Sequence, residues 1–265
     1  IAYRPDPEAA LDGLLSAIYH RLGLLRLDAG EVGMATATTT HSGTGPEAAF
    51  VALTANPAMG DHCQPVDDGG DTVQLDCTPD YQTTRREPMT AQPPWVAWPP
   101  PGATDIPPAF FEETPDPLSD YSVSGYPVSL QFNPTDVADV TVNDLRLRRD
   151  GEAVAFITAM DAGNDPHGVL GEHQFAWFPE KRLAWGADYE VTAEVVTDGE
   201  QQTLRWSFAT RELPGEVHTV AADSATVSVV AGQRANLYLP PASRHQDGLE
   251  WSVSHPGDTS LESHA

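Results

Sequence analysis

Apolar and polar residues alternate in successive stretches of the chain between residues 126 and 212. The stretches read YPVSLQFN, DVTVNDLRLRRDGEAVAFITAM, HQFAWFP and ADYEVTAEVVTDGEQQTLRWSFAT. A period of two places alternate side chains on opposite faces of a strand, and the Asp-Gly pairs in RDGE and TDGE favour tight hairpins. Short strands at regular spacing are typical of a β-sandwich. The sequence therefore predicts a mainly β protein with a sandwich over residues 126–212.

The sequence on either side of the sandwich differs in character. Residues 57–125 are rich in proline and glycine, yet they contain aromatic residues at 95, 98, 110 and 111. Those aromatic residues predict an ordered, extended segment that lies across a domain surface rather than a free linker. Residues 213–265 return to a β-like pattern in ATVSVVAGQRANLYLPP and GLEWSVSHPGD. We expect this last part to be a further β module that is incomplete.

Residues 1–56 have a pattern of mixed helix and strand. Asp6, Pro7 and Glu8 form a helix start, with an N-cap acid and proline at the first helical position. Leucine and isoleucine at helical spacing then predict one amphipathic helix of about four turns that ends near Gly23. The stretches EVGMATATTT and AAFVALTAN predict two strands joined by the turn HSGTG. A helix and a hairpin cannot easily close a core alone, so we expect another segment or domain to cover them.

The charge of the chain excludes one class of partner. Acidic residues number 39 and basic residues 14, which gives a formal net charge of −25. Nucleic-acid binding needs a basic surface, and the short run Arg146, Arg148, Arg149 fits the solvated face of a strand. Such acidity is typical of proteins adapted to a salty medium. We find no apolar run long enough to span a membrane and no signal peptide in the sequence.

Two cysteines, Cys63 and Cys77, flank the polar loop QPVDDGGDTVQLD. The pattern favours one disulfide, which implies an oxidising compartment, and a closed loop of this length contributes about 3 kcal/mol of stability. A metal or redox pair is the alternative, although the CxxC spacing is missing.

Two stretches resemble known families. AIYHRLGLLRLDAGEVGMATA, residues 17–37, resembles the C-terminal half of bacterial CAP-superfamily domains (cysteine-rich secretory, antigen 5 and pathogenesis-related), with FVALTAN as the next strand. KRLAWGADYEVTAEVVTDGEQQTLRWSFAT resembles the end of a bacterial Ig-like domain, and YPVSLQFNP resembles its first strand. The resemblance implies a partial α/β CAP module over residues 1–56, a connecting segment over 57–125, an Ig-like sandwich over 126–212 and the further module.

The CAP resemblance also implies a candidate site residue. The CAP cavity holds two histidines and two acids that can bind a divalent ion such as zinc, and only His20 matches one of the four here. Because a zinc site needs three or four ligands, the hypothesis requires residues from elsewhere. The alternative is structural, since a cationic side chain in the last turn of a helix complements its negative end.

A second candidate site lies in DAGNDPHG. Asp161, Asn164 and Asp165 could coordinate calcium through oxygen atoms, but the pattern departs from the EF-hand and a turn between strands is the alternative. The DDGGD stretch, residues 67–71, carries the same two interpretations. We find no nucleophile motif, so we assign no catalytic residue.

These observations lead to three functional hypotheses. The first is a secreted or cell-surface binding or structural protein of the CAP superfamily, which contacts a protein or a glycan and has no defined catalytic activity. The second is a metal-assisted hydrolase that uses a CAP cavity completed by upstream residues. The third is a subunit of an extracellular assembly or filament. No cofactor is assigned beyond a zinc or calcium ion at the candidate sites.

Overall fold

The computed structural model describes residues 6–38, 48–66, 74–220, 226–240, 252 and 254, and it confirms a mainly β fold. The predictions for the turn HSGTG, for the DDGGD stretch and for most of GLEWSVSHPGD lie outside these residues.

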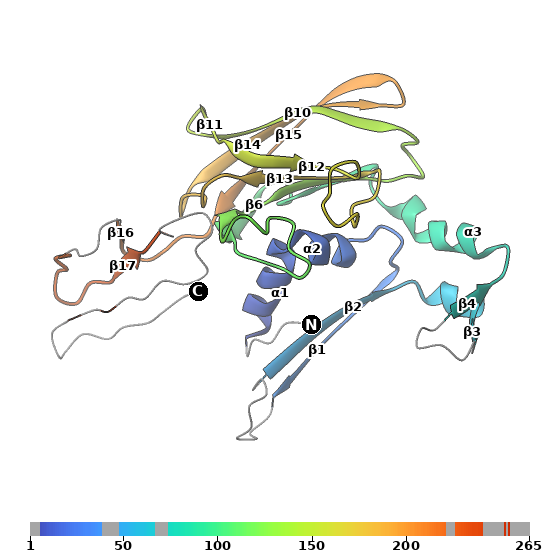
Figure 1. Ribbon diagram of the computed structural model, residues 1–265, viewed down its shortest axis with the longest axis horizontal. Coiled ribbons are helices and arrows are strands. Elements are labelled where there is room, and N and C mark those ends of the chain that lie inside the picture. Colours follow the sequence, from blue (N-terminus) through green and yellow to red (C-terminus); the bar gives the residue numbers. More distant parts are fainter. Residues whose placement is uncertain are drawn as a thin grey trace.

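Two β-sheets pack face to face (Figure 1). The four-stranded sheet is antiparallel and has the order β12 (Phe156–Met160), β13 (Gln174–Pro179), β9 (Val128–Phe132), β5 (Trp95–Trp98). The five-stranded sheet has the order β11 (Glu152–Ala153), β10 (Val140–Arg149), β14 (Asp188–Thr197), β15 (Glu200–Thr210), β6 (Ala103–Ile106). Inward side chains of both sheets form one apolar cluster, which is the core of the predicted sandwich.

Both predicted Asp-Gly pairs make turns of the expected kind. Asp150 and Gly151 join β10 to β11, and Asp198 and Gly199 join β14 to β15. All four residues have positive φ, from 51° to 84°. Two consecutive residues of positive φ match the right-handed twist of the flanking strands, which explains the choice of Asp-Gly.

The proline-rich segment contributes strands to both sheets. β5 pairs with β9, and β6 runs parallel to β15. Trp95 and Trp98 pack against the core, and the Trp98 indole N–H donates to the Tyr126 hydroxyl at 2.8 Å. The sandwich therefore draws strands from outside residues 126–212, because the apolar side chains of this segment complete its core. Short elements occupy much of the rest of the described segment: η1 (Pro57–Asp61), β3 (Cys63–Val66), β4 (Gln74–Cys77), α3 (Tyr81–Arg86), η2 (Glu87–Ala91), β7 (Ala109–Phe110), β8 (Ser124–Gly125).

The N-terminal residues form two helices and a hairpin. Asp6 accepts the backbone N–H of Glu8 at 3.1 Å, which confirms the predicted N-cap. The single predicted helix is wrong, however, since the chain breaks at Ala17 into α1 (Pro7–Ser16) and α2 (Ile18–Leu24). The predicted hairpin forms from β1 (Glu31–Thr38) and β2 (Ala48–Ala55), paired antiparallel.

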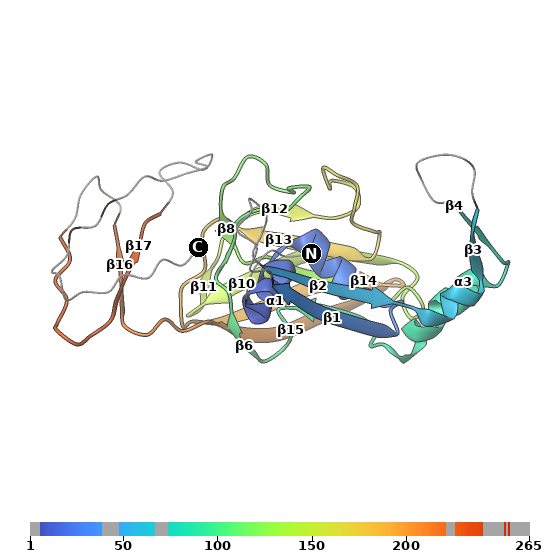
Figure 2. The ribbon, with the colours of Figure 1, turned by 90° about the horizontal axis from the view of Figure 1, so that it is seen from below.

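The helices lie between the hairpin and the outer face of the four-stranded sheet (Figures 1 and 2). Ile18 and Leu22 of α2 pack with Phe178 of β13, whereas Leu14 of α1 packs with Phe50 of β2. The layers are thus hairpin, helices, four-stranded sheet and five-stranded sheet. The sandwich provides the cover that the helix was expected to need.

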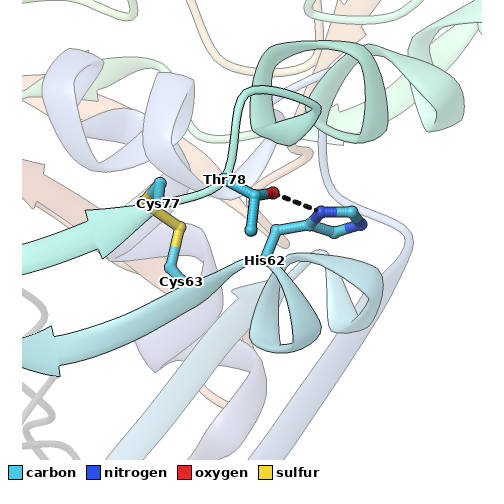
Figure 3. The surroundings of a disulfide bond; sticks show 4 residues. All are labelled: His62, Cys63, Cys77 and Thr78. Atoms are coloured by element: carbon cyan, nitrogen blue, oxygen red, sulfur yellow. Dashed lines mark hydrogen bonds between the residues drawn. A yellow bond between two sulfur atoms is a disulfide. The ribbon is translucent and has the colours of Figure 1, made fainter.

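The predicted disulfide joins Cys63 of β3 to Cys77 of β4, which face each other in the antiparallel register (Figure 3). Beside it, His62 bridges two hydroxyl groups, with Nδ1 at 2.8 Å from Thr78 and Nε2 at 3.1 Å from Thr84 of α3. The disulfide thus fixes a small hairpin that is joined through His62 to Thr84 within α3 and to Thr78 before it.

An ion-pair network connects the turn after α2 to α3. The buried Asp28 carboxylate accepts from Arg26 at 2.5 and 2.7 Å and from Arg85 at 2.6 Å. The hydrogen bonds from Arg26 and from Arg85 lower the pKa of Asp28 to about 2, and they outweigh burial, which would raise it. A lowered carboxyl pKa stabilises the folded state above the ordinary value of 3.8, and this stabilisation is lost as the pH falls towards 2.

We therefore predict that Asp28→Asn lowers the free energy of unfolding at pH 7 by about 1–2 kcal/mol, after allowance for solvent at the half-exposed arginines. Urea unfolding of the wild type and the variant between pH 7 and pH 3 measures the difference. The difference should shrink as the pH falls. A constant difference over this range would mean that Asp28 acts through packing and not through its charge.

Two short strands come after the sandwich in the sequence. β16 (Glu216–Thr219) runs parallel to β17 (Ala235–Tyr238), and the Arg182 guanidinium lies 4.1 Å from the centre of the Tyr238 ring. In the portion of the chain that the structure describes, we find no helix long and apolar enough to cross a membrane.

Candidate functional site at the helix break

The break at Ala17 brings two helix ends together inside the protein. Ala17 is extended, with φ −77° and ψ 116°, so the last carbonyl groups of α1 and the first N–H groups of α2 both need partners. Ala17 has no side-chain atom that could serve as a cap. Two charged side chains, Arg21 and Glu113, supply the partners instead.

Arg21 is fully buried and caps the end of α1. Its Nε donates to the Leu15 carbonyl at 2.5 Å, and one of its terminal nitrogens donates to the Pro127 carbonyl at 2.8 Å and to the Ser129 hydroxyl at 3.0 Å. Pro127 directly precedes β9 and Ser129 lies within it. One side chain thus joins α1, α2 and the four-stranded sheet.

Tyr126 supports the guanidinium through its ring. The Arg21 carbon Cζ lies 4.9 Å from the centre of the Tyr126 ring, and the Tyr126 hydroxyl donates to the Leu15 carbonyl at 3.0 Å. A cation over an aromatic face gains attraction that partly offsets its lost hydration. Burial still lowers the pKa of Arg21, with the charge of Glu113 opposing that shift.

Glu113 caps the start of α2 from a distant part of the sequence. Its side chain is only 1% exposed. The carboxylate accepts the Tyr19 backbone N–H at 3.1 and 3.2 Å and the His20 backbone N–H at 3.3 Å. A negative charge at a helix start and a positive charge at a helix end both match the helix dipole. Arg21 and Glu113 therefore hold the break by hydrogen bonds to both helix ends, and the sign of each charge matches the helix dipole.

His20 joins this group through its ring. Its Nδ1 lies 3.0 Å from the same Glu113 carboxylate, and its side chain is 38% exposed. Burial raises the pKa of Glu113, while the hydrogen bonds from His20 and from the backbone oppose the shift. His20 lies in the first turn of α2, so the expectation that it complements a helix end in the last turn is wrong. The break at Ala17 is the reason.

Asp165, one of the proposed calcium ligands, is hydrogen-bonded to α2. Asp165 accepts the hydroxyl of Tyr19, the residue before His20, and its other oxygen accepts the backbone N–H groups of Val169 and Leu170 at 2.6 and 2.8 Å. Although burial opposes the shift, the hydrogen bond from Tyr19 and those from the backbone lower the pKa of Asp165. Next to it, the His167 ring meets the Tyr19 ring edge to face at 6.0 Å.

The other two proposed calcium ligands bond within their own loop. Asp161 accepts the Gly163 backbone N–H at 2.8 Å, and the side-chain oxygen of Asn164 accepts the Asp161 N–H at 2.8 Å. Oxygen atoms that close a turn in this way favour the structural interpretation. Across residues 6–38, 48–66, 74–220 and 226–240 we find no group of three or more His, Cys, Asp or Glu side chains that could hold a metal ion.

Sequence reasoning missed Arg21 and Glu113. A signal for Arg21 was available, because it lies seven residues after Leu14 and three after Ile18, on the apolar stripe of the helix. Glu113 carried no comparable signal, since its partners lie 93 and 94 residues away in the chain.

The sequence matches no protein-family model and no curated protein sequence.

Proposed function

We propose that this chain is an extracytoplasmic binding or structural protein, built from a module that resembles the C-terminal part of a CAP domain and from an Ig-like sandwich. The observation that carries the proposal is the use of both buried charges at the helix break. Arg21 and Glu113 form their hydrogen bonds with the two helix ends and with the start of β9. Buried charged groups with such partners fix one part of a protein to another. The helices and hairpin are thereby held on the sandwich as a rigid support for a contact surface.

The disulfide supports an extracytoplasmic location for this protein. The Cys63–Cys77 disulfide forms and persists in oxidising compartments. The excess of acidic residues indicates a salty medium, because a high net charge keeps a protein soluble there.

A metal-assisted hydrolase is the second candidate, and one observation favours it. Nδ1 of His20 lies 3.0 Å from the buried Glu113 carboxylate, and the His20 side chain is 38% exposed. Nε2 is therefore the ring nitrogen that remains to bind a metal ion or to act as a base. Histidines that bind metals or act as bases are commonly oriented by a carboxylate in this way. This function requires at least two more ligands beside His20.

Zinc binding separates the two candidates. We expect the purified protein to contain no stoichiometric zinc by elemental analysis, and calorimetric zinc titrations of His20→Ala and of the wild type to be the same. His218→Ala on β16 is the control for loss of any histidine. One zinc ion per chain that is lost in His20→Ala and retained in His218→Ala would contradict the structural proposal and support the hydrolase.

A further inference from the structure

Strand β1 is exposed along its whole length, from Glu31 to Thr38. Among the described residues its only paired neighbour is β2, so its other edge presents unpaired backbone N–H and C=O groups. Large apolar side chains accompany this edge, with Val32 60% and Met34 54% exposed. An edge of this kind is a template for another strand.

The helices cover only one part of the hairpin. Side chains of opposed residues point to the same face of a sheet, so Val32 and Met34 share a face with Thr54 and Ala52. This is also the face of Phe50, which packs on α1. Val32 and Met34 therefore form an apolar stripe that lies between the helix-covered part of the hairpin and the free edge.

The charge of the strand indicates what can cover it. Two copies of a chain with a net charge of −25 repel each other unless they meet where charges are sparse. β1 has the sequence EVGMATAT, in which Glu31 at the end is the only charged residue. It also lacks the lysine and proline residues that commonly protect edge strands. A second copy can thus approach this edge with little local repulsion.

We infer that β1 pairs antiparallel with β1 of a second copy of this chain. A two-fold axis perpendicular to the sheet keeps side chains on matching faces, so residues of even sum pair across it. With Met34 opposite the partner's Met34, Val32 lies opposite the partner's Thr36 and the two apolar stripes become neighbours. Glu31 of each copy then lies near the far end of the other strand.

This inference deepens the proposed function, because it names a second copy as the partner of the surface that the sandwich supports. Salt has a defined effect on such a dimer. It screens the repulsion between two acidic chains and strengthens apolar contacts. The dissociation constant measured by sedimentation equilibrium should therefore fall by about tenfold or more when NaCl is raised from roughly 0.1 M to roughly 2 M.

Cysteine substitution tests the contact directly. The chain has two cysteines, both in the disulfide, so an added cysteine is the only free thiol. Directly opposed residues of antiparallel strands have Cα atoms about 5 Å apart, within reach of a disulfide. Met34→Cys should form covalent dimers under mild oxidation. Leu53→Cys is the matched control, since Leu53 is 67% exposed on β2 and would lie about 16 Å from its symmetry mate, across three strand spacings and two residues along the strand.

The inference is supported if Met34→Cys forms covalent dimers about tenfold faster than Leu53→Cys and if Met34→Glu, but not Leu53→Glu, abolishes the dimer in sedimentation. It is overturned if the protein is a monomer in high salt or if both cysteine variants cross-link at equal rates. A monomer would leave the zinc and His20 results unchanged, so failure here is distinguishable from failure of the proposed function.

Discussion

Replacing Arg21 by methionine should lower the free energy of unfolding by about 3–5 kcal/mol, the usual cost of removing one member of a buried charged network. Methionine fills a similar volume, but it removes the donor to the Pro127 carbonyl and one of the two donors to the Leu15 carbonyl, and it removes a buried positive charge that interacts with Glu113. Guanidinium unfolding followed by tryptophan fluorescence measures the change.

Two further variants separate the role of Arg21 from the loss of any arginine. Arg205→Met on β15 removes an exposed guanidinium and should change the stability by no more than about 0.5 kcal/mol. Arg21→Lys keeps the charge but lacks the planar guanidinium that reaches three acceptors. We therefore expect its free energy of unfolding to remain well below that of the wild type. If Arg21→Lys were as stable as the wild type, charge alone would be sufficient and the capping of α1 would be unimportant.

Removing the Glu113 side chain should have the second largest effect. Glu113→Ala leaves the N–H groups of Tyr19 and His20 buried without an acceptor, which costs about 2–4 kcal/mol in total. Glu113→Gln is the matched variant, because the amide oxygen can still accept while the charge is absent. We therefore expect Glu113→Gln to be clearly more stable than Glu113→Ala in the same unfolding experiment.

The pH dependence of Glu113→Gln follows from the raised pKa of Glu113. A carboxyl whose pKa is raised on folding gives its full stabilisation below its ordinary value of 4.5, and that stabilisation is lost as the pH rises through the folded value. The wild type should thus lose stability relative to Glu113→Gln as the pH rises above 4.5. The opposite slope would mean that the pairing with His20 outweighs burial.

Local patterns predicted the local elements of the fold. Alternation over residues 126–212 identified the main strands, and the two Asp-Gly pairs identified hairpins whose positive φ values the structure confirms. The N-cap at Asp6 and the disulfide were also correct. Each of these depends on residues close in the sequence or on chemistry with few alternatives.

Features that depend on distant residues were not predicted. Continuous apolar spacing indicated one helix through Ala17, but Arg21 and Glu113 supply hydrogen bonds to the two helix ends that meet there. The placement of β5 and β6 likewise depends on core packing with strands that follow them in the chain. His20 lies beside the break, but its closest polar contact, Glu113, could not be identified from spacing.

Hydrogen exchange at the amides of Tyr19 and His20 tests the central claim most directly, which is that the helix break and the sandwich form one rigid unit held by Arg21 and Glu113. We predict that both amides exchange only through global unfolding, with the same free energy as Val191 in the core of β14, and that Glu113→Ala makes them exchange through local opening. Exchange of these amides in the wild type that is orders of magnitude faster than at Val191 would contradict the account.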